Sequence, residues 1–244
     1  MQLFKTKNRL LKMLAPLDRS PGPPAHVQAH HGPFGQWDNQ EHLATLQSLG
    51  LKPSDSVLDY GCGYGRMAEH LFAWGVENYA GIDCNAEAIA YARRHYGYPG
   101  YTFQLVQAES ELYGNGQNAR VFIPEGPTVA IAQSLVTHTL PGETASIFNS
   151  IHACPTITRA YVSCFIAKTC TEASGCGARI PLANGVWVKN KHNFSAVVCY
   201  TQSMFRRLAA GWNVEFHMGH WGAFDPSDCR EKGWPYQDYA VLTR

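Results

Sequence analysis

The first half of the chain alternates between strand-like and helix-like segments. Between residues 54 and 107 the strand-like segments are SVLDYG, NYAGID and YTFQLVQ, and the helix-like segments RMAEHLFAWG and AEAIAYARRHYG lie between them. Strands and helices that alternate through short connections form βαβ units around a mainly parallel sheet. The sequence therefore predicts an α/β protein with a doubly wound sheet.

The second half adds strands and helices to this pattern. Strands are expected at 128–134, 160–166, 212–218 and 238–244, and helices around 142–152 and at 201–211. The last two strands follow one another as a pair, so we expect them to close one edge of the sheet. The prediction is a mainly parallel seven-stranded sheet.

The sequence predicts two parts, an N-terminal segment that ends at residue 37 and a main domain that follows it. Residues 1–37 are expected to form an N-terminal helix and a connector that caps the main domain, since the segment 18–37 carries four prolines, three glycines and three histidines. The main domain is expected at 38–244, with 167–195 as a variable excursion. The basic first helix either packs on its own domain or makes a weak contact with a membrane surface or a protein.

Three glycines follow the first predicted strand in the stretch VLDYGCGYG. Gly61, Gly63 and Gly65 allow a tight turn and a close approach of a ligand to the backbone, and the following helix offers free N–H donors. Asp83 ends the second strand 20 residues after Gly63, where a carboxylate can accept hydrogen bonds from both hydroxyls of a ribose. This arrangement predicts a ligand that contains adenosine.

Spacing narrows the identity of that ligand. A dinucleotide fingerprint would place glycine at position 66, which is Arg66 here, and the turn has no glycine-lysine pair of a P-loop. Asp59 precedes the turn and puts a negative charge where a phosphate would lie. We therefore expect a ligand with an ammonium group.

These motifs resemble those of class I S-adenosylmethionine-dependent methyltransferases. The stretch from Asp59 to Gly65 resembles motif I, and SLVTHTLPGETASIF and GHWGAF…YQDYAVLTR resemble segments of a bacterial type 11/12 subgroup that methylates small molecules or glycans. The likeness covers about residues 30 to 244. It departs from the family at Thr128, where the subgroup has aspartate, and in CPTITR, which replaces a Lys-Pro-Gly-Gly turn.

The resemblance implies S-adenosylmethionine as cofactor and S-adenosylhomocysteine as product. It places Asp59 near the amino group of the methionine portion and Asp83 at the ribose hydroxyls, with Ala108 and Glu109 beside the adenine. The full set of expected cofactor residues is Asp59, Gly61, Gly63, Gly65, Asp83, Cys84, Ala108, Glu109 and Ser134.

A hydroxyl acceptor would also need a base to take its proton, and an imidazole is the obvious candidate. His138 follows the fourth strand and is our first choice, although it could instead hold its loop; His31 and His220 come next. His30 and His217 complete the candidates, whereas His42, His70, His95 and His152 lie inside predicted helices and are expected to be packing or surface residues. Aromatic walls for the acceptor are expected from Phe34, Trp37, Trp221 and Tyr236.

Composition argues against several other functions. The net charge is +1 and charged residues make up 16%, so no overall positive field favours nucleic acid. The chain has SLVTHT after the fourth strand, where base-flipping enzymes commonly carry an Asn/Asp-Pro-Pro-aromatic motif. Eight scattered cysteines suit reduced thiols in a cytoplasmic protein, and the spacing of Cys170 and Cys176 is too wide for a metal knuckle.

Three functions remain open from the sequence. The first is O-methylation of a small polar, sugar-containing or glycan-precursor acceptor. The second is N- or C-methylation in natural-product biosynthesis, and the third is a cofactor-binding protein without turnover that acts through a partner. The sequence leaves the identity of the acceptor and the oligomeric state open.

Overall fold

The computed structural model of the 244-residue chain describes residues 40–106, 126–175, 177–190, 192–193, 197–218 and 237–244. The predictions for residues 1–37 lie outside this part. Within it, no helix has both the length and the apolar character that a membrane span requires.

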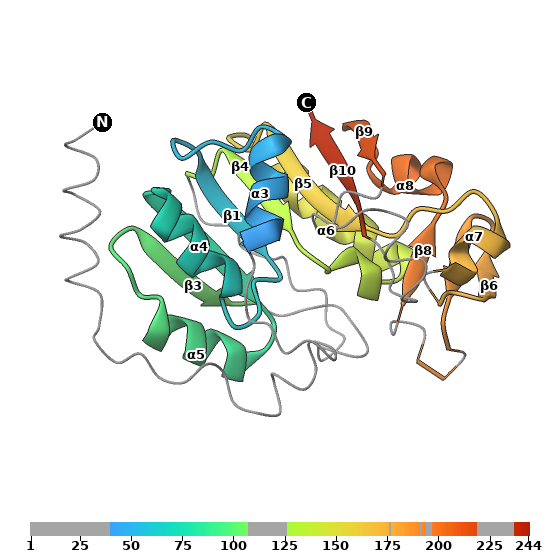
Figure 1. The fold of residues 1–244 in the computed structure, drawn as a ribbon, viewed down its shortest axis with the longest axis horizontal. Coiled ribbons are helices and arrows are strands. Elements are labelled where there is room, and N and C mark those ends of the chain that lie inside the picture. Colours follow the sequence, from blue (N-terminus) through green and yellow to red (C-terminus); the bar gives the residue numbers. More distant parts are fainter. Residues whose placement is uncertain (1–39, 107–125, 176, 191, 194–196, 219–236) are drawn as a thin grey trace.

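A seven-stranded sheet with the strand order β3-β2-β1-β4-β5-β10-β9 forms the centre of the described structure (Figure 1). Strands β1 to β5 run parallel, and β10 pairs antiparallel with both β5 and β9. The predicted doubly wound, mainly parallel sheet is confirmed. Its strands are β1 Ser56–Tyr60, β2 Asn78–Asp83, β3 Tyr101–Leu105, β4 Val129–Ala132, β5 Arg159–Cys164, β9 Asn213–His217 and β10 Asp238–Thr243.

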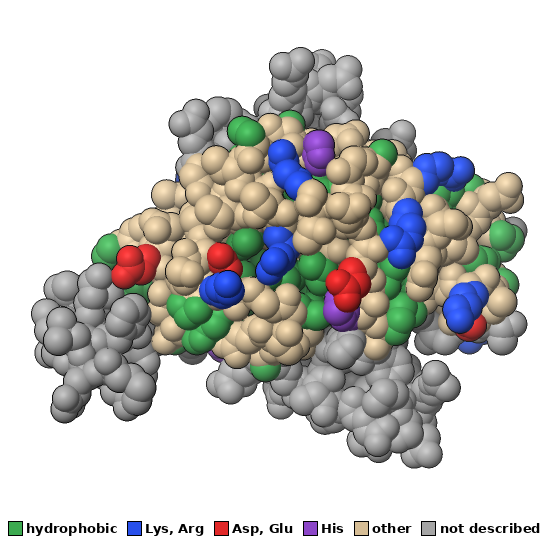
Figure 2. All heavy atoms as spheres, turned by 90° about the horizontal axis from the view of Figure 1, so that it is seen from above, with side chains coloured by type: hydrophobic (Ala, Val, Ile, Leu, Met, Phe, Trp, Pro, Cys, Tyr) green, Lys and Arg blue, Asp and Glu red, His purple; other side chains and the backbone are tan. Residues whose placement is uncertain are grey.

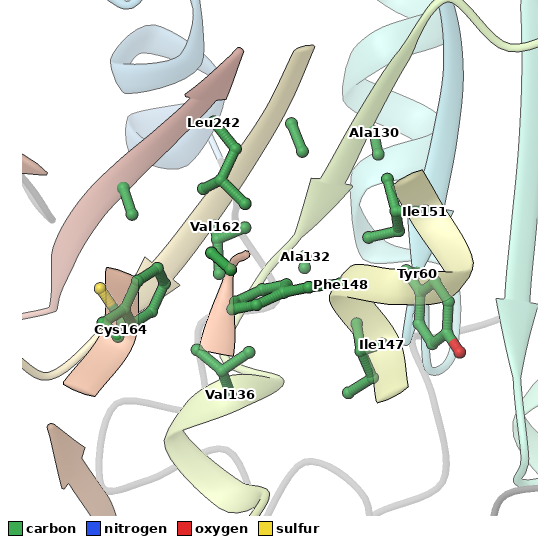
Figure 3. Packing of buried hydrophobic residues seen from close by; sticks show 14 of the residues in the cluster. Tyr60, Ala130, Ala132, Val136, Ile147, Phe148, Ile151, Val162, Cys164 and Leu242 are labelled. Atoms are coloured by element: carbon green, nitrogen blue, oxygen red, sulfur yellow. The ribbon is translucent and has the colours of Figure 1, made fainter. Parts of the chain in front are cut away.

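Helices cover both faces of the sheet, because the side chains of each strand alternate between two apolar cores. Val57 of β1 belongs to the core under α3, α4 and α5, whereas its neighbour Leu58 belongs to the core under α6 and α8. In the second core, Phe148 of α6 lies against the strands beside Ala132 and Val162 (Figure 3). The helices are α3 Gln40–Ser48, α4 Arg66–Trp74, α5 Ala86–His95, α6 Pro141–Ala153 and α8 Gln202–Leu208.

His42 of α3 confirms the expectation that helical histidines serve packing. It is buried and shares a hydrogen bond with the phenol of Tyr239 in β10. Burial lowers the pKa of His42 to about 3, since a charged imidazole would lose its hydration there. The neutral ring thus ties the first described helix to the last strand.

The excursion after β5 folds into a helix and a second, antiparallel sheet, β6-β7-β8, which lies at the opposite end of the molecule from β3 and α5 (Figure 1). Tyr200 of β8 joins this small sheet to the main domain. Its hydroxyl donates to the carbonyl oxygen of Thr139 at 2.5 Å and lies 3.0 Å from Oγ1 of Thr144. The elements are α7 Cys170–Gly175, β6 Ile180–Ala183, β7 Val186–Val188 and β8 Val198–Tyr200.

The buried phenol of Tyr200 gives a test of this junction. Tyr200→Phe should lower the free energy of unfolding by about 1 to 3 kcal/mol, because it leaves two buried oxygens with one partner fewer. Urea denaturation followed by circular dichroism measures the change. Tyr91→Phe is the control: that side chain is half-exposed, water can replace its partner, and a change within about 0.5 kcal/mol is expected. Equal losses in the two variants would contradict a specific role for Tyr200.

Candidate cofactor and acceptor site

The glycine-rich turn connects β1 to α4 at the carboxyl edge of the sheet. The backbone N–H groups of Gly61 and Cys62 donate to the carbonyl oxygen of Ile82 at 2.8 and 3.0 Å, so the turn is held against the end of β2. Gly61, Gly63 and Gly65 have φ values of 78°, 52° and 80°. Residues with a Cβ atom rarely adopt this left-handed backbone conformation, which explains why the turn needs glycine at these positions.

Gly63 marks the open side of the turn. A Cβ atom built on Gly63 would meet no heavy atom of the described residues within 4 Å, whereas one on Gly61 would lie 3.0 Å from Cδ1 of Leu135. The turn is therefore packed against protein at Gly61 and uncovered at Gly63. A ligand can approach the backbone at Gly63 without a clash.

Asp83 stands at the end of β2 and faces this open side. Its Oδ2 accepts a hydrogen bond from the Gly63 N–H at 2.8 Å, and its Oδ1 accepts one from the Asn85 N–H at 2.8 Å. Burial raises the pKa of the Asp83 carboxyl, while these N–H groups and the Cys84 thiol favour its ionised form. Each carboxylate oxygen keeps a lone pair, so Asp83 can still accept from two ligand hydroxyls.

Asp59 is the second-last residue of β1, just before the turn, and is almost fully buried, at 2% exposure. Its Oδ2 accepts a hydrogen bond from the phenol of Tyr79 at 2.7 Å. Burial raises the pKa of the Asp59 carboxyl to about 7; the Tyr79 hydrogen bond and the Arg66 charge oppose this shift, and the Asp83 charge adds to it. Asp59 is thus a carboxyl whose charge is costly unless a cation comes close.

Ser134 follows β4 at the same edge, with a left-handed φ of 53°. Its N–H donates to Oγ of Ser163 at 2.7 Å, and its own Oγ lies 2.9 Å from Nε2 of Gln237. Oγ of Ser163 donates to Oε1 of Gln237 at 2.7 Å. The ends of β4 and β5 and the start of β10 are linked by these three uncharged side chains.

The remaining predicted residues fall into two groups. His138 is exposed on the short 3-10 turn Val136–His138 after β4, and His217 ends the edge strand β9, four strands along the sheet from β1. Their predicted roles as bases stay predictions. Outside the described residues lie His30, His31, Phe34, Trp37, Ala108, Glu109, His220, Trp221 and Tyr236.

Sequence reasoning missed Ser163, Gln237 and Tyr79. Each of them acts through a contact between segments distant in the chain, such as the 74 residues that separate Ser163 from Gln237. The polar Gln-Asp pair at the start of an otherwise apolar last strand was the available signal for Gln237. Among the described residues, no group of three or more histidine, cysteine, aspartate or glutamate side chains is placed to hold a metal ion.

The residues present suit an adenosyl cofactor. Gly63 offers an uncovered backbone, and Asp83 offers two acceptor oxygens beside it, as the ribose of such a cofactor requires. The site lies where β1 is flanked by β2 on one side and β4 on the other, which is the switch point of the doubly wound sheet.

Comparisons with known proteins support a methyltransferase fold. Residues 57–152 match the family model described as a methyltransferase domain. The fold is similar to that of an S-adenosylmethionine-dependent methyltransferase from Mesorhizobium loti, with a TM-score of 0.59, 14% identity and coverage of 86% of this chain and 100% of that one. It also resembles magnesium protoporphyrin IX methyltransferase from Synechocystis PCC 6803 with bound S-adenosylmethionine, with a TM-score of 0.53, 15% identity and coverage of 92% and 86%.

A third similar structure is the complex between the Haloferax volcanii Trm112 methyltransferase activator and a methyltransferase, with a TM-score of 0.59, 12% identity and coverage of 89% of this chain and 94% of that one. At such identities the structures establish the fold, and the matched segment contains both the glycine turn and Asp83. The chain has the class I methyltransferase fold, and its residues 57–152 match a methyltransferase domain.

The raised pKa of Asp59 predicts a dependence of stability on pH. The folded chain keeps this proton up to about pH 7, whereas the unfolded chain loses it near the ordinary value of 3.8, so Asp59 makes stability fall as pH rises through this window. Asp59→Asn cannot ionise. The free energy of unfolding of Asp59→Asn minus that of the native chain should therefore grow by on the order of 3 kcal/mol between about pH 4 and about pH 7.

Urea denaturation at several pH values measures this difference. Tyr79→Phe is the informative companion variant, because losing the phenol donor removes a hydrogen bond that favours ionised Asp59. Its stability should go on falling with rising pH to a higher pH than that of the native chain, because the pKa of Asp59 is raised further. If the free energies of unfolding of Asp59→Asn and the native chain differ by the same amount at every pH in this range, the Asp59 carboxyl is ionised throughout the range, which would contradict the prediction.

Proposed function

We propose that the chain transfers the methyl group of S-adenosylmethionine to a hydroxyl oxygen of a small polar, sugar-containing or glycan-precursor acceptor. The observation that carries the proposal is the position of the uncharged Ser134–Ser163–Gln237 cluster beside the glycine turn. Neutral hydroxyl and amide groups match an uncharged polyhydroxy acceptor better than a charged one.

The cofactor is assigned to the turn and the strand ends next to it. Asp83 would accept from the ribose hydroxyls while its Oδ2 keeps the Gly63 N–H in place. Asp59 would lie toward the amino group, where a cationic neighbour favours its ionised form. Gly61, Gly65, Cys84 and, outside the described residues, Ala108 and Glu109 complete the proposed contacts.

When bound, S-adenosylmethionine supplies a methyl group that its sulfonium has already activated for nucleophilic attack. The task left to the chain is to hold the acceptor in line and to exclude water. A lone pair of the acceptor oxygen forms the new C–O bond, the C–S bond breaks with its electron pair on sulfur, and the hydroxyl proton passes to a base. His138 is proposed as that base because it follows β4 and is exposed at this edge.

The near-neutral net charge of +1 supports a small neutral acceptor over nucleic acid. On the face shown in Figure 2, which lies opposite the glycine turn, the lysine and arginine side chains of the described residues are dispersed among neutral and acidic ones. A polyanion would need them gathered in a continuous patch.

The first test of the proposal concerns the cofactor. Asp83→Ala should weaken binding of S-adenosylhomocysteine at least ten-fold, about 1.4 kcal/mol, because the ribose loses its acceptor and Gly63 loses the bond that fixes it. Isothermal titration calorimetry measures the affinity. Asp55→Ala is the control, since its carboxylate also accepts a backbone N–H but lies in an exposed turn before β1. Unchanged affinity in Asp83→Ala would refute the assignment.

The second test identifies the methylated atom. The protein is incubated with S-adenosylmethionine labelled with carbon-13 in its methyl group and with extract of the organism that encodes it. Carbon–proton correlation spectra then separate O-methyl from N-methyl and C-methyl products by their carbon shifts. An O-methyl signal that falls at least ten-fold in His138→Ala is expected, in keeping with the usual contribution of a general base.

Either of two results would count against this chemistry. An N-methyl or C-methyl signal from the native chain would move the function to the alternative acceptor classes. An O-methyl signal of full strength in His138→Ala would remove that histidine from the reaction while leaving the proposed acceptor class in place.

A further inference from the structure

The hydrogen bonds among Ser134, Ser163 and Gln237 run in one direction around the three residues. Oγ of Ser163 accepts the backbone N–H of Ser134 and donates its hydroxyl proton to Oε1 of Gln237. This fixes the orientation of the amide and turns its Nε2 toward Oγ of Ser134. The three side chains form a closed ring of hydrogen bonds.

The hydroxyl proton of Ser134 makes the longest of the hydrogen bonds among these three residues. The carbonyl oxygen of Ser134 accepts from Oγ1 of Thr137 at 2.8 Å, its N–H is used by Ser163, and its Oγ accepts from Gln237. The remaining hydroxyl proton has a long inward contact, 3.3 Å, to Oε1 of Gln237, which already accepts from Ser163. Turning this proton outward to a ligand would therefore cost little.

The backbone of Ser134 supports a functional interpretation of the ring. Within the part of the chain that the structure describes, it is the one non-glycine residue with a positive φ. Such a conformation is unfavourable for an L-residue and persists where its surroundings enforce it, which occurs preferentially at functional sites. Here the bonds to Ser163, Gln237 and Thr137 enforce it.

The ring also lies on a definite side of the cofactor site. Asp83 ends β2 and the glycine turn follows β1, while the ring joins β4, β5 and β10, which continue the sheet in that order. Leu135, the neighbour of Ser134, packs on Gly61 and separates the two regions. If a cofactor with its ribose at Asp83 extends past the glycine turn along this strand order, its methyl group would lie toward the ring, and a molecule that receives the methyl group would approach from beyond.

We propose that the Ser134–Ser163–Gln237 ring seats an uncharged oxygen of the acceptor, a hydroxyl or carbonyl next to the hydroxyl that is methylated, with the Ser134 hydroxyl as donor. This inference rests on the proposed function and adds to it that the acceptor carries two neighbouring oxygens. Gln237 and Ser163 are positioning residues, because they orient Ser134 and need not touch the acceptor.

The polarity of the ring supports an uncharged group. None of its three side chains titrates near neutrality. Asp238 follows Gln237, but strand alternation turns its side chain to the other face, where its Oδ2 accepts the Ile166 N–H at 2.9 Å. An ammonium or carboxylate placed on the ring would find no opposite charge within it.

Ser134→Gly is the principal test variant. It removes the hydroxyl, and glycine adopts a positive φ without strain, so the fold is preserved. Gln237→Leu removes the amide that orients the hydroxyl, and the double variant combines both changes. Ser150→Ala on α6 is the matched control. It also removes a serine hydroxyl, but this one lies outside the ring and donates to the carbonyl oxygen of Ser146.

Two measurements are made on each variant: the rate of O-methyl formation from carbon-13-labelled S-adenosylmethionine and extract, and the affinity for S-adenosylhomocysteine. Ser134→Gly and Gln237→Leu should each slow O-methyl formation at least ten-fold, with a partial recovery at higher extract concentration and an affinity within two-fold of native. Because Gln237 acts through Ser134, the double variant should be no slower than Ser134→Gly alone. The control should match the native chain.

Three results would overturn the inference. A ten-fold loss of S-adenosylhomocysteine affinity in Ser134→Gly would assign its hydroxyl to the cofactor, as the sequence predicts. A native O-methylation rate in Ser134→Gly would show that the ring seats nothing, while the proposed function would stand. Absence of any O-methyl product from the native chain would overturn the proposed function, and with it the proposed binding of an acceptor oxygen by the ring.

Discussion

The hydrogen bond from the Gly63 amide to the Asp83 carboxylate is the interaction on which the proposed site depends. It joins the end of β1 to the end of β2 at a point where the backbone is otherwise uncovered. Because both oxygens of Asp83 are held by backbone donors, the carboxylate is oriented before any ligand arrives. Such preorganisation lowers the entropy that binding has to offset.

Two kinds of polar side chain lie along the carboxyl edge of the sheet. Carboxylates stand under and beside the glycine turn, at Asp59 and Asp83, whereas neutral hydroxyl and amide groups gather at β4, β5 and β10. The antiparallel insertion of β10 next to β5 is what brings Gln237 to Ser163. The small sheet of the excursion holds the loop after β4 from its far side, through the phenol of Tyr200 on Thr139. A cationic, adenosine-bearing cofactor and a neutral acceptor would each meet matching groups along this edge.

The sequence predicted the parts of the fold that have local signals. Alternating strand and helix patterns predicted the seven strands of the main sheet to within two residues at every strand end, and the spacing of the glycines placed the turn at Gly63 correctly. The second, antiparallel sheet was not predicted, because its strands have only three or four residues, too few to show a clear alternation, and β6 is largely exposed. The Ser134 ring was missed for another reason: it consists of residues up to 103 positions apart, and only the strand order brings them together.

A crystal structure of the chain with S-adenosylhomocysteine tests the central claim most directly. The account predicts that the ribose hydroxyls lie on the carboxylate of Asp83, that the homocysteine portion passes the open side of Gly63, and that the Ser134 hydroxyl is left without a contact to the product. A product bound away from Gly63 would contradict the cofactor site. Homocysteine atoms hydrogen bonded to the Ser134 hydroxyl would contradict the division of this edge between cofactor and acceptor.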